Sequence, residues 1–440
     1  MPASLSNLQD LRTALGQLNA ERPASAGPRE GYTQYEPRGG DFLRRLDLEV
    51  SARQKDARVL VTGQIGVGKS SELLRFSQNQ SRRRETIFCD LEKEEHPDRC
   101  GATGVFLTVL RDCWSKTLHY QSRVQRSGDR GLSELCHEIL IPLIDSLKGQ
   151  YTQDKRKVVF RFGGMDYPLL LEDRHRALAI ILGKAAQHEA VSQPSDRFGL
   201  VPDTLVHLVN RVLRWIGGHG AGRVPLLIVD HVDKIRDVGA AEDVLVKAAP
   251  HWNRIEASII MTAPYEHTLG DLRNSVESRW GRPLMLYPLV TPDLAGVSIP
   301  PIYLNLGKNA GLERLIRPES LRILAHYSGG ILRTFVQFLV QACKEAHLAG
   351  HDQIEPSDAK DVVHVHETAY QDYGAANLEL LDRIADTGAG LGEAATLLRS
   401  PIGILVGEPD RGEQRLRVHP LAQAAVERYR LKKSKAVGVR

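Results

Sequence analysis

Short apolar runs alternate with amphipathic segments along the chain up to about residue 311. The runs predict buried strands, because they are brief and rich in β-branched residues. The predicted strands are Arg58–Thr62, Thr86–Leu91, Val224–Asp230, Ala257–Thr262 and Pro283–Tyr287. The predicted helices are Ser71–Gln78, Val105–Leu118, Leu132–Leu147, Arg174–Ala190, Thr204–Ile216 and Ala240–Ala248. This alternation is typical of an α/β fold with a parallel, doubly wound sheet.

Beyond residue 312 the strand pattern gives way to helices. Apolar residues at helical spacing predict the helices Pro318–Ala325, Ile331–Ala349 and Pro356–Ala369, which together suggest a small helical lid. A further helix, Leu378–Ala385, is followed by two short β segments, Ile402–Val406 and Arg415–Val418, and by a closing helix that opens at His419. Helices around a β-hairpin suggest a C-terminal winged helix.

These patterns divide the chain into five parts. We expect an N-terminal arm over 1–45, with a short helix at Leu5–Leu18, and a nucleotide-binding α/β domain over 46–311 with an insertion near 150–195. The helical lid covers 312–370, the winged helix 371–429, and a basic tail 430–440.

Composition adds limits rather than a function. Apolar residues make up 42% of the chain and charged residues 25%, as in ordinary globular proteins. The formal net charge of +4 is too small to name a nucleic-acid partner. Five cysteines without a C-x-x-C spacing indicate a reduced, cytoplasmic protein. No apolar run is long enough to predict a membrane span.

The most specific motif follows the first predicted strand. It matches G-x-x-x-x-G-K-[ST], the phosphate-binding loop of nucleoside-triphosphate enzymes. Glycines let backbone N–H groups close around phosphates, Lys69 would reach the β- and γ-phosphates, and the Ser70 hydroxyl would bind Mg²⁺. The alternative is a glycine-rich turn. The expected nucleotide-binding residues are Gly63, Gln64, Ile65, Gly66, Val67, Gly68, Lys69, Ser70 and Ser71.

Besides the phosphate loop, an acidic residue is needed to hold Mg²⁺ from the side opposite Ser70. Asp230 ends the apolar strand Leu226–Asp230 and is our candidate, although a strand can also simply end at an aspartate. Many such ATPases place a carboxylate directly after this aspartate to orient or deprotonate water. His231 occupies that position here. Asp233 is an alternative acid, or else a capping or ion-paired residue of the turn.

Three further positions are candidates for catalysis. Thr262 ends a strand and could contact the γ-phosphate or the attacking water, or serve only as a β-branched strand end. Arg333 follows Gly329-Gly330 at the start of the long lid helix and could report the γ-phosphate to the lid, or be solvated there. Arg279 is one of three arginines, with Arg273 and Arg282, that could reach a neighbouring subunit's nucleotide.

In this order the motifs resemble those of AAA+ ATPases, particularly the origin-recognition (ORC/Cdc6-like) branch and the STAND-type signal-transduction ATPases. Gly63–Ser70 resembles Walker A, Leu226–Asp230 Walker B, Thr262 sensor 1, and Gly329–Arg333 the start of sensor 2. The turn Asp230–Lys234 resembles the D-x-x-D variant of STAND proteins. Arg417-Val418-His419-Pro420-Leu421 is similar to their winged-helix segment. The resemblance implies ATP and Mg²⁺ as ligands, ATP-dependent assembly, and use in DNA transactions or bacterial defence.

The leading hypothesis is a slowly hydrolysing ATPase switch whose nucleotide state controls lid closure and homo-oligomer assembly. A second is an ORC-like DNA-loading ATPase that binds duplex DNA through the winged helix and basic tail. A third is a nucleotide-bound scaffold for a protein effector that does not hydrolyse ATP, because His231 replaces the usual acid.

Overall fold

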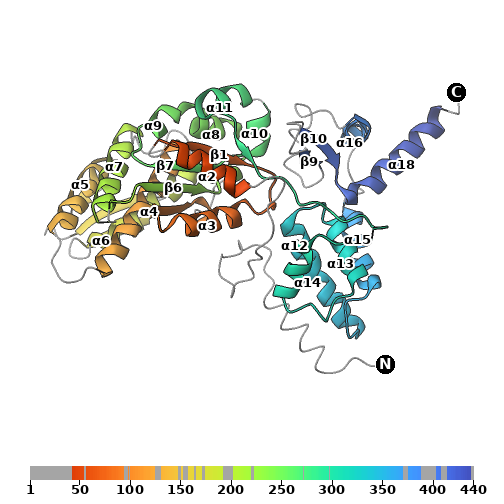
Figure 1. The fold of residues 1–440 in the computed structure, drawn as a ribbon. Coiled ribbons are helices and arrows are strands. Elements are labelled where there is room, and N and C mark those ends of the chain that lie inside the picture. Colours follow the sequence, from red (N-terminus) through yellow and green to blue (C-terminus); the bar gives the residue numbers. More distant parts are fainter. Residues whose placement is uncertain are drawn as a thin grey trace. The chain divides into compact units, whose positions relative to one another are not determined.

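The computed structural model describes most of the chain between residues 42 and 437. The described ranges are 42–53, 56–93, 98, 100–123, 130–146, 150–151, 157–162, 165–170, 174–191, 202–219, 222–270, 272–296, 298–369, 375–387, 403–407 and 414–437. Two compact units share them (Figure 1). The α/β unit comprises Arg44–Thr62 and Phe76–Leu284, and the helical unit contains Gly63–Arg75 and Met285–Arg440. The expected helix Leu5–Leu18 lies outside the described residues.

The five-stranded sheet has the order β2-β6-β7-β1-β8. Its strands are β1 (Arg58–Thr62), β2 (Glu85–Asp90), β6 (Pro225–Asp230), β7 (Ser258–Thr262) and β8 (Leu284–Met285). The pairs β1–β7, β6–β7 and β2–β6 are all parallel, which confirms the predicted α/β class. The carboxyl ends of these strands therefore meet at one edge, where α/β proteins bind their ligands.

Helices cover this sheet, and its central strands β1, β6 and β7 are almost entirely buried. Strand β1 is buried at every position. Helix α4 (Ala102–Arg123) packs against β2 and against α6 (Arg174–Val191) and α7 (Pro202–His219). In the core, Phe106 of α4 stacks on Trp252, with ring centroids 4.1 Å apart. The other helices of this part of the chain are α2 (Phe42–Ala52), α3 (Lys69–Gln80), α5 (Arg130–Ser146), α8 (Val238–Glu242), α9 (Ala249–Asn253), α10 (Tyr265–Leu269) and α11 (Arg273–Trp280).

A buried arginine anchors the amino end of β1. The Arg58 guanidinium is 7% exposed, and its N–H groups donate only to backbone carbonyls in the described network. Burial lowers the pKa of this guanidinium, against the opposing charge of Asp56. The acceptors are the carbonyls of Ala57, Trp252, Asn253, Ile255 and Ala257. These bonds satisfy carbonyls that leave the short helix α9 and lead into β7.

Two predicted elements differ from the structure. The single helix expected over Ala240–Ala248 is wrong: α8 gives way to a π-helical turn, Asp243–Lys247, before α9. The Ala248 N–H donates to the Asp243 carbonyl at 2.9 Å, and this wider turn leaves Val244 and Leu245 both buried. The strand expected over Pro283–Tyr287 is reduced to the two residues of β8.

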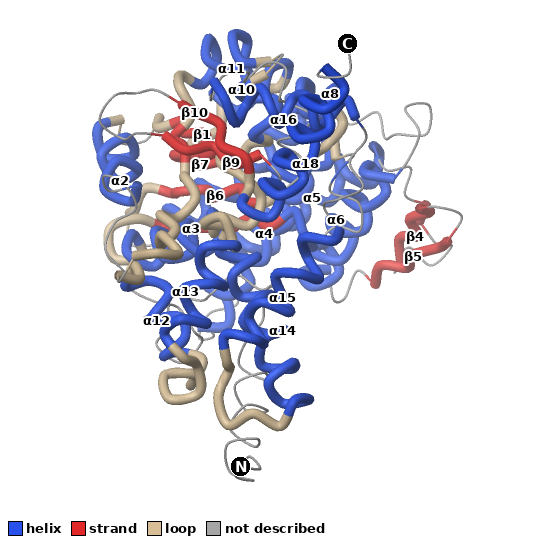
Figure 2. The backbone as a smooth tube through the Cα atoms, turned by 90° about the vertical axis from the view of Figure 1, so that its right-hand side faces the viewer, coloured by secondary structure: helices blue, strands red, loops and turns tan. Residues whose placement is uncertain are grey.

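The expected insertion carries its own small sheet. Strands β3 (Gln150–Tyr151), β4 (Lys157–Phe162) and β5 (Met165–Leu170) pair antiparallel in that order. The hairpin β4–β5 packs against α6 (Figure 2). The pattern indicates a strand only around Val158–Phe160, and β5 is not predicted from it.

The helical unit has its own core. It contains α12 (Pro301–Asn309), α13 (Pro318–Tyr327), α14 (Leu332–Ala349) and α15 (Pro356–Ala369), of which α12 is not predicted from the sequence. Tyr303, Phe335 and Phe338 are fully buried there. Proline occupies the first turn of α12 and α13, and Gly350 ends α14 in the left-handed conformation.

The last elements come in the predicted order. Helix α16 (Ala375–Thr387) precedes the antiparallel hairpin of β9 (Gly403–Gly407) and β10 (Gln414–Val418), and α18 (Pro420–Val437) closes the chain. Helix α18 packs against α13, α15 and α16. The winged helix itself stays a prediction. Among the described helices, none is long and apolar enough to cross a membrane.

Candidate functional site

The phosphate-loop sequence forms a tight turn between β1 and α3. Gly63, Gly66 and Gly68 have φ angles of 152°, 87° and 98°, a region that favours glycine. The Lys69 side chain curls back over the loop, and its ammonium donates to the carbonyls of Gly63 at 2.7 Å and Gln64 at 3.1 Å. Lys69 is 5% exposed. The loop therefore holds a nearly buried cation at the N-terminus of a helix, a position that favours anions.

The loop also contacts the start of α14 within the helical unit. The Arg333 backbone N–H donates to the Gly66 carbonyl at 3.0 Å. A Cβ added to Gly66 would lie 3.0 Å from side-chain atoms of Arg333 and Ile331. The residues of the predicted lid signature thus reach the phosphate loop through the backbone of Arg333.

Polar residues gather at the carboxyl edge of the sheet. The register pairs Asp90 with Asp230. Asp230 is fully buried, and its Oδ1 accepts the His231 backbone N–H at 2.8 Å. Thr262 is also fully buried, and its hydroxyl has no hydrogen-bond partner among the described residues. A buried polar atom without a partner is costly, so this hydroxyl is suited to a ligand or a water molecule.

His231 lies between the carboxylates at this edge. Its Nδ1 donates to Asp90 Oδ1 at 2.6 Å, and its Nε2 lies 3.3 Å from Glu92 Oε2 and 3.8 Å from Asp230 Oδ2. The pKa of His231 is raised. Burial acts to lower it, but the hydrogen bond to Asp90 and the negative charges of Asp230 and Asp90 outweigh burial, while Lys234 opposes them.

Asp90 is the residue that the sequence argument misses. It is the next-to-last residue of the predicted strand Thr86–Leu91 and the last residue of β2. This is a usable signal, because an acid at the carboxyl end of a strand next to β6 lies at the same edge of the sheet. Asp90, Glu92 and His231 also offer ligand atoms within 4.8 Å of one another, a spacing that could hold a metal ion. Ion pairs and hydrogen bonds already account for that grouping.

The remaining candidates lie apart from these contacts. Asp233 is partly buried in the short 3₁₀ turn Val232–Lys234 that follows His231. Arg279 is exposed near the end of α11. Ser70 and Ser71 lie in the first turn of α3, which begins at Lys69. The roles expected of these residues in catalysis and in nucleotide binding stay predictions.

The phosphate loop by itself fits a nucleoside triphosphate with Mg²⁺. It offers glycine backbone, a buried ammonium and a helix N-terminus to phosphates, and the Ser70 hydroxyl is an oxygen ligand of the kind that Mg²⁺ prefers. The orphaned Thr262 hydroxyl agrees with a ligand at the strand edge.

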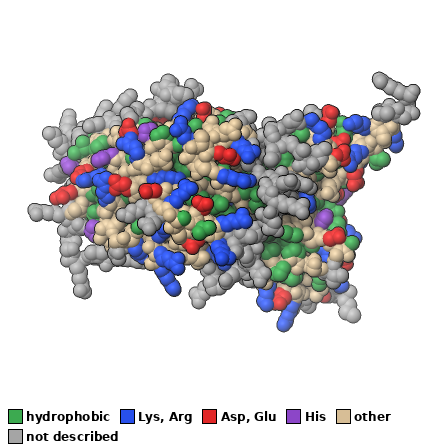
Figure 3. Space-filling model, turned by 45° about the horizontal axis from the view of Figure 1, so that its top comes forward, with side chains coloured by type: hydrophobic (Ala, Val, Ile, Leu, Met, Phe, Trp, Pro, Cys, Tyr) green, Lys and Arg blue, Asp and Glu red, His purple; other side chains and the backbone are tan. Residues whose placement is uncertain are grey.

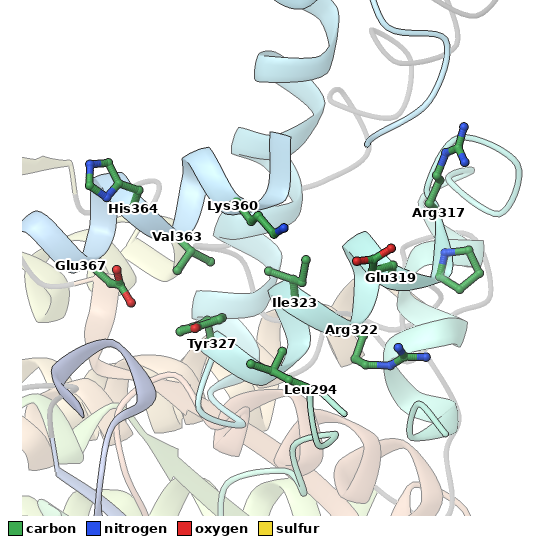
Figure 4. Close-up of a pocket in the computed structure, with 11 residues that line it drawn as sticks. Leu294, Arg317, Glu319, Arg322, Ile323, Tyr327, Lys360, Val363, His364 and Glu367 are labelled. Carbon is green, nitrogen blue, oxygen red and sulfur yellow. The ribbon is translucent and has the colours of Figure 1, made fainter. Parts of the chain in front are cut away.

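A separate cavity of about 790 Å³ lies in the helical unit (Figure 4). Helices α13 and α15 form its walls, and Ile323 and Val363 contribute apolar surface. Its charged lining mixes signs, with Arg322 and Lys360 against Glu319. No residue of the phosphate loop lines it, so this cavity is not the site that the loop predicts.

Comparisons with solved structures find similar architectures. The RuvB Holliday junction branch migration motor of Thermotoga maritima is 12% identical, with 92% of each chain covered and a TM-score of 0.38. The ORC1 protein of Aeropyrum pernix in complex with DNA is 13% identical, over 94% of this chain and 97% of that one, with a TM-score of 0.39. Cdc6p of Pyrobaculum aerophilum is 13% identical, over 92% and 97%, with a TM-score of 0.41.

No protein-family model matches the chain, and no curated protein matches it by sequence. Because the three TM-scores lie below 0.5, the fold assignment rests on the parallel sheet order and on the glycine loop between β1 and α3.

Proposed function

We propose that this chain is an AAA+-like ATPase that binds ATP with Mg²⁺ and hydrolyses it slowly, as a molecular switch. The observation that carries the proposal is the phosphate loop, with Lys69 buried against its carbonyls at the N-terminus of α3. Lys69 would bind the β- and γ-phosphates. Ser70 and Asp230 would bind Mg²⁺, and Thr262 would contact the γ-phosphate or the attacking water.

The lid is the second part of the proposal. The bond from the Arg333 N–H to the Gly66 carbonyl ties the start of α14 to the loop that would hold the phosphates. A γ-phosphate that shifts this loop would therefore act on the lid helix directly. We infer that nucleotide state controls lid closure and homo-oligomer assembly, with the Arg333 side chain as sensor and Arg279 as a candidate finger for a neighbouring subunit.

The test is ATP binding and Mg²⁺-dependent phosphate release by the full chain, with and without Lys69→Ala. We expect the variant to lose both, because the ammonium is the one positive side chain within the loop sequence. Lys247→Ala is the matched control, since Lys247 is 60% exposed and pairs with Glu242 at the surface. Equal phosphate release by wild type and Lys69→Ala would contradict the proposal.

DNA binding is a second candidate function, favoured by the end of α18. Lys432, Lys433 and Lys435 are exposed there. Arg430 pairs with Asp382 and Asp386, and the Lys433 ammonium also lies 4.0 Å from Asp382 Oδ2. On the face drawn in Figure 3, cationic and anionic side chains are interspersed, so that face offers no continuous basic surface to DNA. We expect binding through α18 to fall steeply with salt, because phosphate contacts release counterions.

Deletion of residues 430–440 tests this candidate. Duplex affinity and particle mass would be measured together, with and without ATP, across a salt series. Weak binding that the deletion leaves unchanged would count against a DNA-loading role.

A further inference from the structure

The cavity between α13 and α15 lies wholly within the helical unit, and its two walls run parallel. The helices begin side by side: the Arg317 backbone N–H and the Ser320 hydroxyl both donate to the Ile354 carbonyl, at 3.3 Å and 2.8 Å. They also end side by side, because the pKa of Tyr327 is raised by burial and by the charge of Glu367. The cavity is therefore a groove along two parallel helices.

The charges that line this groove differ between its two ends. Arg322 and Lys360 each lie about one turn into their helix, where the helix N-termini add positive partial charge. Glu319 is the acid at this end, and Glu367 lies in the last turn of α15. Among the described residues, neither Lys360 nor Glu367 has an ion-pair partner. The groove is thus cationic where the helices begin and anionic where they end.

Apolar side chains lie between the charged ends. Ile323 and Val363 face the groove from the two helices, and both are buried (Figure 4). Leu294 adds apolar surface that is 40% exposed. The volume of about 790 Å³ is within the range of sites that hold a ligand or several large side chains. An apolar strip with charged ends suits an amphipathic helix laid along the groove.

The sequence contains such a segment at residues 5–18, which lie outside the described residues. Leucines recur there every three or four positions, the spacing of one helix face. They are Leu5, Leu8, Leu11, Leu15 and Leu18. A helix of this length is only marginally stable in water by itself, so it needs an apolar surface to pack against.

The connection to the rest of the chain is long enough for this segment to reach the groove. Residues 19–41 separate it from α2, and an extended chain of that length spans up to about 75 Å. Docking therefore requires no particular arrangement of the two units. Because the segment is tethered to the groove, its effective concentration there exceeds that of a free partner.

The charges select one direction for the docked helix. If it runs antiparallel to α13 and α15, the positive end of its dipole lies at Glu367 and the negative end lies toward Arg322 and Lys360. Glu21 follows the helix and adds a carboxylate at that cationic end. The opposite direction would place like charges together at both ends.

We propose that residues 5–18 form an amphipathic helix that docks in this groove of the same chain, antiparallel to α13 and α15. Its leucines pack on Leu294, Ile323 and Val363, and Glu21 lies beside Lys360. The contact does not depend on nucleotide, so it goes beyond the proposed ATPase function.

Hydrogen exchange on the full chain without nucleotide tests the apolar contact. In Leu8→Asp, exchange at peptides from α13 and α15 should be roughly tenfold faster or more than in wild type, because a buried leucine is lost. Leu348→Asp, at an 80% exposed leucine of α14, is the matched control and should leave these rates unchanged. Unchanged rates in Leu8→Asp would overturn the proposal.

A charge exchange tests the direction of the helix. Lys360→Glu should speed the same exchange by roughly two- to fivefold, as for other surface ion pairs, and adding Glu21→Lys should restore the wild-type rate. Lys344→Glu, at an exposed lysine of α14, controls for the change in net charge. An additive loss in the double variant would overturn the antiparallel direction.

Cross-linking tells the same chain from a second copy. A carbodiimide condenses the Lys360 ammonium with the Glu21 carboxylate to an amide with loss of water, and mass spectrometry of mixed unlabelled and isotope-labelled full chains shows which copies are joined. We expect the link within one copy, and its loss in Leu8→Asp. Links between copies would overturn docking within the chain and assign the groove to a second copy. Because no nucleotide is present, none of these outcomes bears on the proposed ATPase.

Discussion

The buried histidine that precedes α18 makes the stability of the helical unit depend on pH. His419 is fully buried, and its Nδ1 accepts the Leu421 N–H at 3.3 Å at the start of the helix. Burial lowers its pKa to about 4, outweighing the opposing influence of the Ser328 backbone, and His326 adds to the lowering. The ring is therefore neutral in the folded protein over the physiological range.

The sign of the effect follows from proton binding. The unfolded chain, with a histidine pKa of 6.5, takes up the proton more readily than the folded chain, with about 4. The stabilisation is fully present above pH 6.5 and is lost as the pH falls toward 4. At 1.36 kcal/mol per pKa unit, this amounts to roughly 3 kcal/mol, of which roughly 2 kcal/mol is lost by pH 5.

The perturbation is His419→Gln, which removes the titrating ring and keeps a polar side chain. Hydrogen exchange at peptides from α13 and α18 reports local opening and does not require the whole chain to unfold in one step. At pH 7.5 the variant is expected to be less stable than wild type, because glutamine does not fill the space that the buried imidazole ring occupies. By pH 5 its disadvantage should shrink by roughly 2 kcal/mol, since only wild type carries the proton-linked loss.

Comparing both proteins at each pH cancels titrations that they share. His207→Gln reports the effect of removing an exposed histidine elsewhere. A difference between wild type and His419→Gln that stays constant from pH 7.5 to 5 would refute the reasoning, because it would mean that burial does not alter proton binding at this ring.

Two further predictions concern single atoms. In urea unfolding, Gly330→Ala should destabilise the helical unit by at least about 2 kcal/mol more than Gly350→Ala. Both glycines have positive φ. A Cβ at Gly330 would lie 2.1 Å from the Leu289 carbonyl oxygen, whereas a Cβ at Gly350 would meet nothing within 4 Å. Equal losses would show that the Leu289 segment yields freely. Thr262→Val should change stability by less than about 1 kcal/mol, because the buried hydroxyl has no protein partner to lose, yet lower single-turnover hydrolysis about tenfold or more with ATP affinity retained. An unchanged rate would remove Thr262 from the site.

Local sequence patterns were enough to predict the strand, glycine loop and helix of the phosphate-binding motif and the three lid helices. The strand Arg58–Thr62, the glycine loop and the following helix are adjacent in sequence, and each has its own signal in composition and spacing. The lid helices α13, α14 and α15 are similar, since their apolar stripes and terminal proline or glycine residues mark them directly.

Other features depend on tertiary contacts and carry weaker signals. The segment after Val238 has ordinary helical composition, but burial of both Val244 and Leu245 comes with a π-helical turn that no local propensity specifies. Helix α12 begins with Pro300-Pro301, which reads as a loop until the buried Tyr303 anchors it in the helical core. In both cases packing decides the backbone, and packing is not visible in a window of sequence.

The same difference between local sequence signals and tertiary contacts applies to His231. Read along the chain, it is a missing acid, and a missing acid suggests slow or absent hydrolysis. Read across the sheet, it is bonded to Asp90, which is 141 residues away in sequence and reaches it because β2 pairs with β6. The position of this imidazole is therefore decided by a carboxylate on the neighbouring strand, and no window of sequence around the motif contains that partner.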